Sequence, residues 1–219
     1  MKKSTSLVTP LTIVSVSQAA QWLSIGRLLV YPTESVWGIG CDPFNRDAVQ
    51  QLLTIKQRPI DKGMIVVTDN PERIKPLLDR LNTAQRQAVL DSWQTLPSAS
   101  TQQAHTWLLP LPEQLEIPIP TWITGAHNSV AVRVIAHPLI QQLCAQLVSP
   151  SNPYGFLVST SGNLSGQPPA LSLVQAQSYF VSKDTNDNVA EHVRYLQGDT
   201  LGYQLPSQIK DALTGKILR

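Results

Sequence analysis

Cysteine is scarce in this sequence: the 219 residues include only Cys41 and Cys144, which lie far apart in the chain. Two distant cysteines provide neither a disulfide framework nor the closely spaced ligands of a zinc site. We therefore expect two reduced, partly buried thiols, as is usual in the cytoplasm. The four histidines show no metal-ligand spacing either, so we expect no metal site built from protein side chains.

Long apolar segments are also absent, because no run of 18 apolar residues occurs anywhere in the chain. A transmembrane helix needs about 20 such residues, so we expect a cytoplasmic protein with no membrane partner. The first ten residues, MKKSTSLVTP, contain two lysines but lack the apolar run of a signal peptide. We expect residues 1–10 to form a flexible N-terminal segment.

The common nucleotide-binding and nucleophile motifs are missing. The chain contains no GxxxxGK(S/T) phosphate loop, no GxGxxG and no GxSxG. Hydrophobic residues make up 42% of the chain and charged residues 15%, which indicates a globular protein. The net charge of +2 is too small by itself to argue for nucleic acid, although it allows a local basic patch.

Apolar, β-rich segments alternate with amphipathic helical segments along the chain. We expect strands at residues 11–14, 28–31, 64–68, 106–109, 129–135, 156–160, 193–196 and 207–213. We expect helices at residues 17–25, 45–56, 70–78, 83–90, 137–147 and 172–180, and polar loops at 92–105 and 182–188. Several strands follow one another without a helix between them. This order predicts one α/β domain over residues 1–219, with a twisted mixed β-sheet flanked by helices.

One stretch, residues 31–62, combines a hydroxyl, a carboxylate and a cluster of cations. A strand ends at Tyr31 and leads to Thr33 and Glu34, beside a turn that we expect at the glycines Gly38 and Gly40. A short amphipathic helix follows, and three cations close the stretch: Lys56, Arg58 and Lys62. This combination predicts a site for an anionic ligand.

Further polar groups follow other predicted strands. Ser159, Ser161 and Asn163 come at the end of one strand, and Arg133 lies on another. Ligands of open α/β sheets bind at such strand ends, and arginine holds phosphate or carboxylate by two parallel hydrogen bonds. Each residue alone is more often a solvated surface charge or part of an ordinary turn, and we assign Trp22 and Trp37 to the core. Together the groups suit a ligand with several negative oxygens, such as a nucleoside triphosphate.

Five motifs occur in order: YPTESVWGIGCD, KQRPIDKGMIVV, SVAVRV, STSGNLSGQPP and PSQIKDALTGKILR. Together they resemble the threonylcarbamoyl-AMP synthase family, the YrdC/TsaC proteins, in the short bacterial form. The resemblance covers residues 19–219. It implies a twisted mixed sheet with a concave basic face. It also implies the conversion of L-threonine, bicarbonate and ATP into threonylcarbamoyl-AMP and pyrophosphate.

The resemblance further implies Mg²⁺ as the cofactor that accompanies ATP. Partner proteins of such enzymes use the adenylate to modify the adenosine beside the anticodon of tRNAs that read codons beginning with A. tRNA or double-stranded RNA is implied as a further partner. No residue is an obvious general base, so we expect catalysis by positioning and by cations that stabilise negative charge.

Site residues are carried over from the family motifs. The Lys-x-Arg pair implies Lys56 and Arg58 as catalytic residues. The implied threonine-binding residues are Thr33, Arg133, Ser159 and Ser207. The implied ATP-binding residues are Arg58, Lys62, Ser129, Ser161, Asn163 and Arg219.

Three segments depart from the family pattern. The usual WPGPxT is replaced by SWQTLPSASTQQAHTWLLP, Gly162 replaces an alanine, and QGDTLGYQLPS lacks a glycine pair and a basic residue. We expect these changes to affect ATP binding more than threonine binding. The altered segment at residues 92–105 favours an alternative, an RNA-binding protein of the same fold without synthase activity. A carbamoyl-transfer domain as in hydrogenase maturation is a second alternative, although such domains usually belong to much longer chains with zinc fingers.

Overall fold

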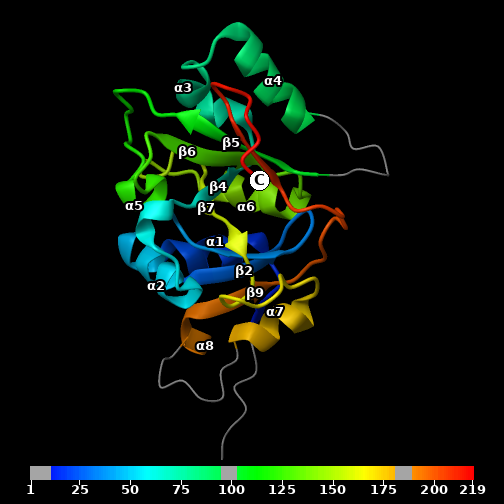
Figure 1. The fold of residues 1–219 in the computed structure, drawn as a ribbon. Helices are drawn as coiled ribbons and strands as arrows, with labels where there is room; N and C mark the ends of the chain where they lie inside the picture. Colours follow the sequence, from blue (N-terminus) through cyan, green and yellow to red (C-terminus); the bar gives the residue numbers. More distant parts are fainter. Residues whose placement is uncertain (1–10, 95–102, 181–188) are drawn as a thin grey trace, which may run out of the picture.

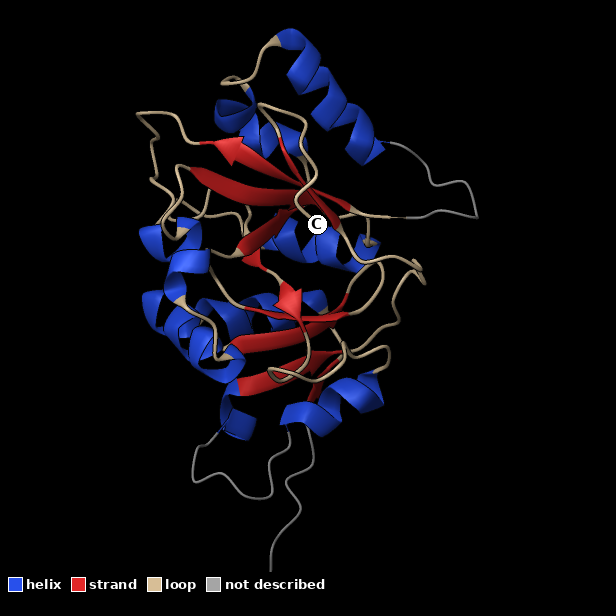
Figure 2. Ribbon diagram, viewed as in Figure 1, coloured by secondary structure: helices blue, strands red, loops and turns tan. Residues whose placement is uncertain are grey.

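The computed structural model describes residues 11–94, 103–180 and 189–219. The predictions for residues 1–10 and 182–188, and for most of the loop at 92–105, therefore fall outside the described residues. The chain forms a mixed α/β domain in which helices flank the strands (Figures 1 and 2). The predicted fold class is confirmed, but the strands form two five-stranded sheets where we expected one.

The first sheet has the strand order β1-β9-β2-β3-β8. Its strands are β1 (Thr12–Ile13), β9 (Val193–Leu196), β2 (Leu28–Pro32), β3 (Trp37–Gly40) and β8 (Thr160–Ser161). β1, β9 and β2 run parallel to one another, whereas β3 is antiparallel to both β2 and β8. All five residues of β2 are buried, which explains its continuous apolar sequence.

The second sheet has the order β10-β5-β6-β4-β7. Its strands are β10 (Gln208–Asp211), β5 (His105–Pro110), β6 (Ser129–Val134), β4 (Ile65–Thr68) and β7 (Leu157–Val158). β10 is parallel to β5 and β4 is parallel to β6, while the β5–β6 and β4–β7 pairs are antiparallel. The C-terminal strand β10 therefore forms one edge of the second sheet, and its four residues are half-buried.

The predicted strand at 156–160 is divided between the two sheets. Residues 157–158 pair with β4, and residues 160–161 pair with β3. Ser159 lies at the crossing point, where its backbone N–H donates to the carbonyl of Ile65 at 2.8 Å. A single apolar run could not reveal this change of partner, because the pattern of one strand does not specify which sheet it joins.

The glycines of the expected turn lie instead in strand β3, so that prediction was wrong. A Cβ added at Gly40 would lie 1.7 Å from the carbonyl oxygen of Val158. Glycine is required there because another backbone approaches closely, a constraint that no local turn signal expresses. β3 is thereby held against the segment that connects the two sheets.

Helices flank the sheets, and six of the helical segments lie close to the predicted ranges, whereas α5 and α8 were not predicted. The helices are α1 (Val16–Ser24), α2 (Arg46–Lys56), α3 (Lys75–Leu78), α4 (Thr83–Gln94), α5 (Thr121–Thr124), α6 (Pro138–Gln146), α7 (Leu173–Phe180) and α8 (Val189–His192), with 3₁₀ turns at Ile60–Lys62 and Pro71–Ile74. The Asn45 side chain accepts from the N–H of Ala48 and begins α2 as predicted. Ser15 caps α1, so this helix begins one residue before the predicted range 17–25.

Two apolar clusters form the core. The larger contains Trp37 and Phe156, and the smaller joins α1 and α6 to both sheets. Cys41 and Cys144 are both free thiols, as predicted, but both are fully buried where we expected partial burial. Within the described residues, none of the helices has the length and apolar character needed to cross a membrane.

Candidate ligand-binding site

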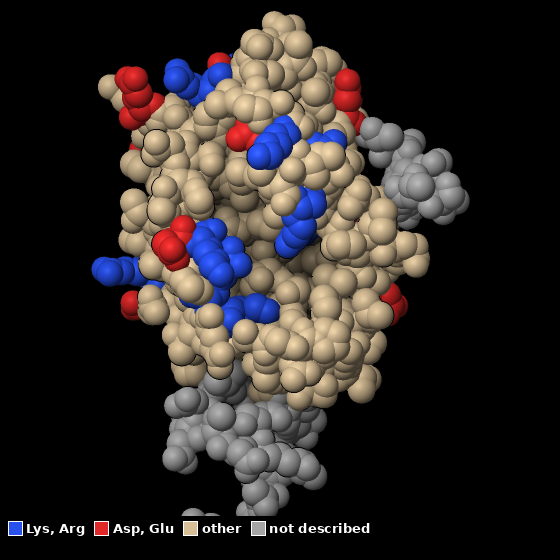
Figure 3. Space-filling model, in the orientation of Figure 1, with Lys and Arg blue, Asp and Glu red and all other residues tan. Residues whose placement is uncertain are grey.

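A cavity of about 510 Å³ opens where the two sheets meet. Its walls include residues of β3 and β8 from the first sheet and of β4, β5, β6 and β10 from the second. Figure 3 shows the blue lysine and arginine atoms on several sides of a central hollow. Among the described residues, the charged ones that line the cavity are all cations, with no aspartate or glutamate: Arg58, Lys62, Arg133 and Arg219. Such a lining suits an anionic ligand.

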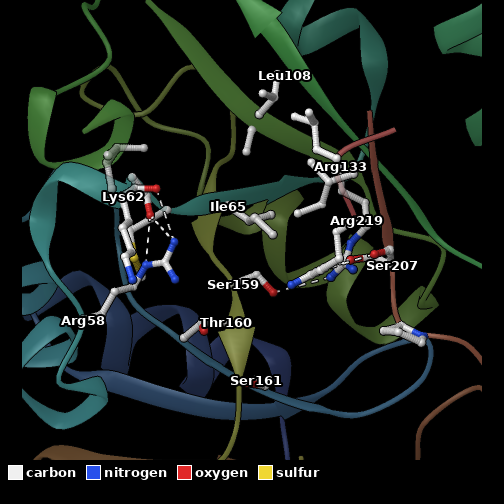
Figure 4. A pocket seen from close by; sticks show the side chains of 18 of the residues that line it. Arg58, Lys62, Ile65, Leu108, Arg133, Ser159, Thr160, Ser161, Ser207 and Arg219 are labelled. Carbon is white, nitrogen blue, oxygen red and sulfur yellow. Dashed lines mark hydrogen bonds between the residues drawn. The ribbon is translucent and has the colours of Figure 1, made fainter. Parts of the chain in front are cut away.

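One end of the cavity, which we call the Arg58 end, consists of Arg58 and Lys62 (Figure 4). Helix α2 stops at Gln57, whose φ of 46° is left-handed, and the chain turns back through residues 58–63. Nε and Nη2 of Arg58 donate to the carbonyl of Gly63 at 3.1 and 2.7 Å. Burial lowers the pKa of Arg58 from its usual value. The guanidinium is thus held by its own loop.

The opposite end, which we call the Arg133 end, brings together Arg133, Ser159, Ser207 and Arg219 (Figure 4). Nη2 of Arg133 lies 3.5 Å from the Ser159 hydroxyl. Nη2 of Arg219 donates to the Ser207 hydroxyl at 3.2 Å. Burial lowers the pKa of Arg219, and the charges of Arg133 and Arg58 lower it further. The cations at the two ends therefore influence one another across one cavity.

Arg219 reaches this cavity through the C-terminal segment. The N–H of Ile209 in β10 donates to the carbonyl of Arg219 at 2.9 Å, and the N–H of Leu218 donates back to Ile209 at 2.8 Å. These bonds fold residues 212–219 back along β10, and the red end of the chain in Figure 1 runs over the middle of the molecule. A residue at the end of the sequence is therefore part of the cavity wall.

Hydroxyl groups cover the region between the two ends. Thr33 is 3% exposed, and its hydroxyl donates to the carbonyl of Val36 at 2.6 Å. Its oxygen lone pairs remain as acceptors for a ligand donor such as an ammonium group. The structure places four more predicted residues on the cavity wall: Ser129, Ser159, Ser161 and Ser207.

Two predicted site residues, Lys56 and Asn163, do not line the cavity. Nζ of Lys56 donates to the carbonyls of Ser161 and Asn163 at 2.8 and 2.5 Å, and to Oδ1 of Asn163 at 3.2 Å. Nδ2 of Asn163 donates to the carbonyls of Leu164 and Gln167. Burial, together with the charge of Arg58, lowers the pKa of Lys56 to about 8. In this structure both side chains hold the loop that carries Ser161.

The cavity also includes residues that the sequence analysis missed, among them Thr124, His127 and Thr160. Thr124 and His127 line the cavity, and the segment that carries them packs on the 3₁₀ turn Ile60–Lys62. The N–H of Ala126 donates to the carbonyl of Asp61 at 3.0 Å. A Cβ at Gly125 would lie 2.3 Å from that same carbonyl oxygen. In the sequence, Gly125 is the local sign that another backbone approaches this loop. A single glycine does not show which segment approaches it.

The fold and the site define an α/β protein with a cationic cavity between two sheets, a cavity suited to an anionic ligand. Residues 21–219 match the family model of the Sua5/YciO/YrdC proteins, described as telomere recombination. The chain belongs to this family, as its motifs indicated.

Relatives of known name support the assignment. The chain is 68% identical over 215 residues to a protein of Psychrobacter arcticus named threonylcarbamoyl-AMP synthase, covering 98% of this chain and 100% of the relative. Two solved structures share the fold. P. abyssi Sua5 complexed with L-threonine has a TM-score of 0.70 at 23% identity, covering 93% of this chain, which spans 54% of that protein. E. coli YciO has a TM-score of 0.67 at 17% identity, covering 93% of this chain and 87% of that protein.

Proposed function

We propose that this protein is an L-threonylcarbamoyladenylate synthase, a nucleotidyltransferase that makes threonylcarbamoyl-AMP and pyrophosphate from L-threonine, bicarbonate and ATP. One observation carries the proposal: a single cavity has a cationic group at each end, and no aspartate or glutamate of the described residues lines it. The cavity volume of about 510 Å³ is of the size that small-molecule sites have. The name of the Psychrobacter arcticus relative, at 68% identity, agrees with this proposal.

The two ends of the cavity suit two different substrates. We assign the phosphates of ATP to the Arg58 end, where Arg58 and Lys62 provide positive charge. We assign the carboxylate of threonine to Arg133, and its hydroxyl or amine to Thr33 and Ser159. Apolar side chains lie between, including Ile65 and Leu108 (Figure 4). P. abyssi Sua5, which shares the fold, was solved in complex with L-threonine, and this complex is consistent with the assignment.

The proposed reaction has two bond-forming steps. The amine of threonine attacks the carbon of bicarbonate or of CO₂ derived from it, and a carbamate forms with loss of water from bicarbonate. A carbamate oxygen then attacks the α-phosphorus of ATP, and the bond to pyrophosphate breaks. Arg58 and Lys62 stabilise the negative charge that develops on phosphate, and Arg219 adds positive charge to the same cavity from the opposite end. The cavity shields the carbamate from water, which would otherwise release CO₂.

Magnesium enters this proposal as part of the MgATP substrate. The cavity lining contains no carboxylate, and the described residues contain no cluster of three His, Cys, Asp or Glu that could hold a metal ion. Mg²⁺ commonly keeps several waters and binds through substrate phosphates, so it fits this cavity when it arrives with the nucleotide. The ion would neutralise phosphate charge there.

The product is a reactive mixed anhydride, which requires a downstream acceptor. We propose that partner proteins in the cytoplasm transfer the threonylcarbamoyl group to tRNA, as the resemblance implies. Direct binding of tRNA or double-stranded RNA to this chain is a separate proposal. RNA binding is the function that we expect if the chain lacks synthase activity.

Pyrophosphate release by the purified protein tests the proposal. The assay contains MgATP and bicarbonate, with L-threonine or with L-serine as the control amino acid. We expect release that requires both bicarbonate and threonine, and that falls about 10²–10³-fold in Arg58→Ala. A folded protein that releases no pyrophosphate but binds RNA, with an affinity that falls steeply with salt, would favour the RNA-binding alternative.

A further inference from the structure

Glu34 is a buried carboxylate beside the cavity, and the proposed reaction gives it no role. It is 1% exposed, and no other acidic residue in the described part of the chain is buried. An ionised carboxylate removed from water costs several kcal/mol unless its surroundings compensate the charge. The groups that surround Glu34 therefore indicate what it does.

The main chain fixes the position of this carboxylate. Oε1 of Glu34 accepts from the backbone N–H of Ala136 at 3.0 Å. The backbone carbonyl of Glu34 accepts from the N–H of Tyr203 at 2.9 Å, and the carbonyl of Thr33 accepts from the N–H of Leu201 at 3.2 Å. Three separate segments thus meet at Glu34. Backbone groups of these segments, and no flexible side chain, hold its main chain and its carboxylate in position.

The second carboxylate oxygen faces Arg133. Oε2 of Glu34 lies 3.6 Å from Nη2 of Arg133. This distance is too long for a hydrogen bond, and Oε2 has no hydrogen-bond partner among the described residues. The contact is therefore electrostatic, and it does not consume the donors of the guanidinium.

Arg133 keeps most of its donors available. It is 8% exposed; Nη2 also lies 3.5 Å from the hydroxyl of Ser159, and Nε has no partner in the described part of the chain. A guanidinium has five N–H donors in a rigid plane, and it matches a carboxylate with two of them. A negative charge fixed behind Arg133 holds the plane in the cavity and leaves its front to a ligand.

The other cations of the cavity make such a counter-charge necessary. Arg58 and Arg219 share the cavity with Arg133, and these like charges repel one another. A long side chain without a fixed partner would reduce this repulsion by turning toward water. Glu34 opposes that movement at one position only, because it contacts Arg133 and not Arg58 or Arg219.

We infer that Glu34 is a positioning residue that orients the guanidinium of Arg133 for the carboxylate of the amino-acid substrate. This inference rests on the proposed function, because it takes L-threonine as the ligand of Arg133. It predicts that the loss of the Glu34 charge weakens threonine binding selectively and leaves ATP binding intact.

Calorimetric titration of Glu34→Gln with L-threonine, and separately with a non-hydrolysable ATP analogue, tests the inference. Glutamine keeps the shape and the acceptor for Ala136 but removes the charge. We expect the Kd for threonine to rise about tenfold or more, and that for the ATP analogue to change less than about twofold. Glu72→Gln, at an exposed glutamate, is the matched control and should change neither affinity.

A double-mutant cycle shows whether Glu34 acts through Arg133. Arg133→Gln itself should weaken threonine binding, so the titrations of this variant use higher threonine concentrations. In this background we expect Glu34→Gln to change the Kd for threonine by less than about twofold. If the single Glu34→Gln variant does not fold, a more than twofold change in the Kd for threonine between Arg133→Gln and the uncharged double variant still overturns the inference.

Three results would overturn the inference: unchanged threonine affinity in Glu34→Gln, equal weakening of both ligands, or an equally large effect in the Arg133→Gln background. A different result marks failure of the proposed function itself. In that case the wild-type protein binds the ATP analogue but not L-threonine, and the inference falls with it.

Discussion

The two ends of the cavity are built in different ways. The Arg58 end comes from one continuous segment, residues 57–63, and backbone carbonyls of that segment hold the Arg58 guanidinium. The Arg133 end is assembled from β6, the chain crossing at Ser159 and the C-terminal segment. A buried carboxylate, Glu34, holds its central cation. A local segment thus makes one end, and the tertiary fold makes the other.

This difference has an electrostatic consequence. Carbonyl dipoles at the Arg58 end leave its positive charge almost uncompensated, which suits a polyanion such as a triphosphate. The carboxylate at the Arg133 end balances one of its arginines, which suits a ligand with a single negative charge. The comparison predicts that variants at the two ends affect different substrates.

The largest expected effect is a loss of stability in Gly40→Ala, which should disturb both ends of the cavity. The new Cβ would lie 1.7 Å from the Val158 carbonyl, so β3 must separate from the segment that carries Ser159. Backbone cannot move aside as a side chain can, and we expect destabilisation of about 3 kcal/mol or more by denaturant unfolding. At Gly198 a Cβ would meet only side chains, the nearest at 3.1 Å, so Gly198→Ala is the matched control with a smaller loss. Equal stability of the two variants would contradict the close approach at β3.

The second largest expected effect is a loss of turnover in Arg58→Ala. This variant should affect the Arg58 end of the cavity and leave the Arg133 end unchanged. Removal of one charged donor from a preorganised site reduces turnover by about 10²–10³-fold. We expect pyrophosphate release to fall by this amount while threonine affinity and thermal stability stay near those of the wild type. Arg80→Ala, at an exposed arginine outside the cavity lining, is the control. If Arg58→Ala weakened threonine binding as strongly as ATP binding, the two ends would not be distinct.

Lys56 should produce a smaller effect that depends on pH. Its pKa is lowered to about 8, so the ammonium that holds the Ser161–Asn163 loop loses its proton as the pH rises through this value. We expect the KM for ATP to rise above about pH 8 in the wild type and to change less in Lys56→Met. The sequence analysis placed Lys56 among the catalytic residues, and a direct role predicts complete loss of synthesis in Lys56→Ala. A position behind the cavity wall predicts partial loss.

The free energy of unfolding should not fall together with the ATP affinity as the pH rises above about 8. Between about pH 8 and pH 10.5 the unfolded chain keeps the Lys56 proton that the folded protein has lost, so the contribution of this group to stability rises with pH. Denaturant midpoints measured at pH values on both sides of 8 provide the check. A fall in stability that parallels the fall in ATP affinity would mean that unfolding, and not loop position, explains the effect.

The smallest effect should come from Gly162→Ala, which restores the alanine of the family motif. A Cβ at residue 162 would lie 3.0 Å from the carbonyl oxygen of Trp37, a tight contact that requires a small shift. Alanine also reduces the freedom of the unfolded chain by about 0.4–1 kcal/mol, which offsets this strain. We expect stability to change by less than about 1 kcal/mol, with little change in ATP affinity. A large gain in ATP affinity would show that Gly162 weakens the site.

Much of the fold was predictable because its signals are local. Asn45 and Ser172 cap helices where the sequence placed them, and Pro138 lies in the first turn of α6. The buried strand β2 was recognisable from its continuous apolar run. β3 was missed because its glycines oppose strand propensity, and only the nearby backbone of Val158 explains them.

The site was predictable in its residue types but not in their arrangement. Arg58, Arg133 and Arg219 line the cavity as the family motifs implied, whereas Lys56 and Asn163 bind the loop behind it. A motif records that a residue type is needed at a position. It does not distinguish a group that faces a ligand from one that supports the wall.

The sequence by itself determined the family, the mixed α/β class and the Arg58 end, because these depend on short segments whose residues act on their neighbours. Only the tertiary structure decided that there are two sheets and that the chain changes sheets at Ser159. It also decided that a carboxylate lies behind Arg133. Those features depend on contacts between segments about 100 residues apart, and local propensity and spacing cannot specify such contacts.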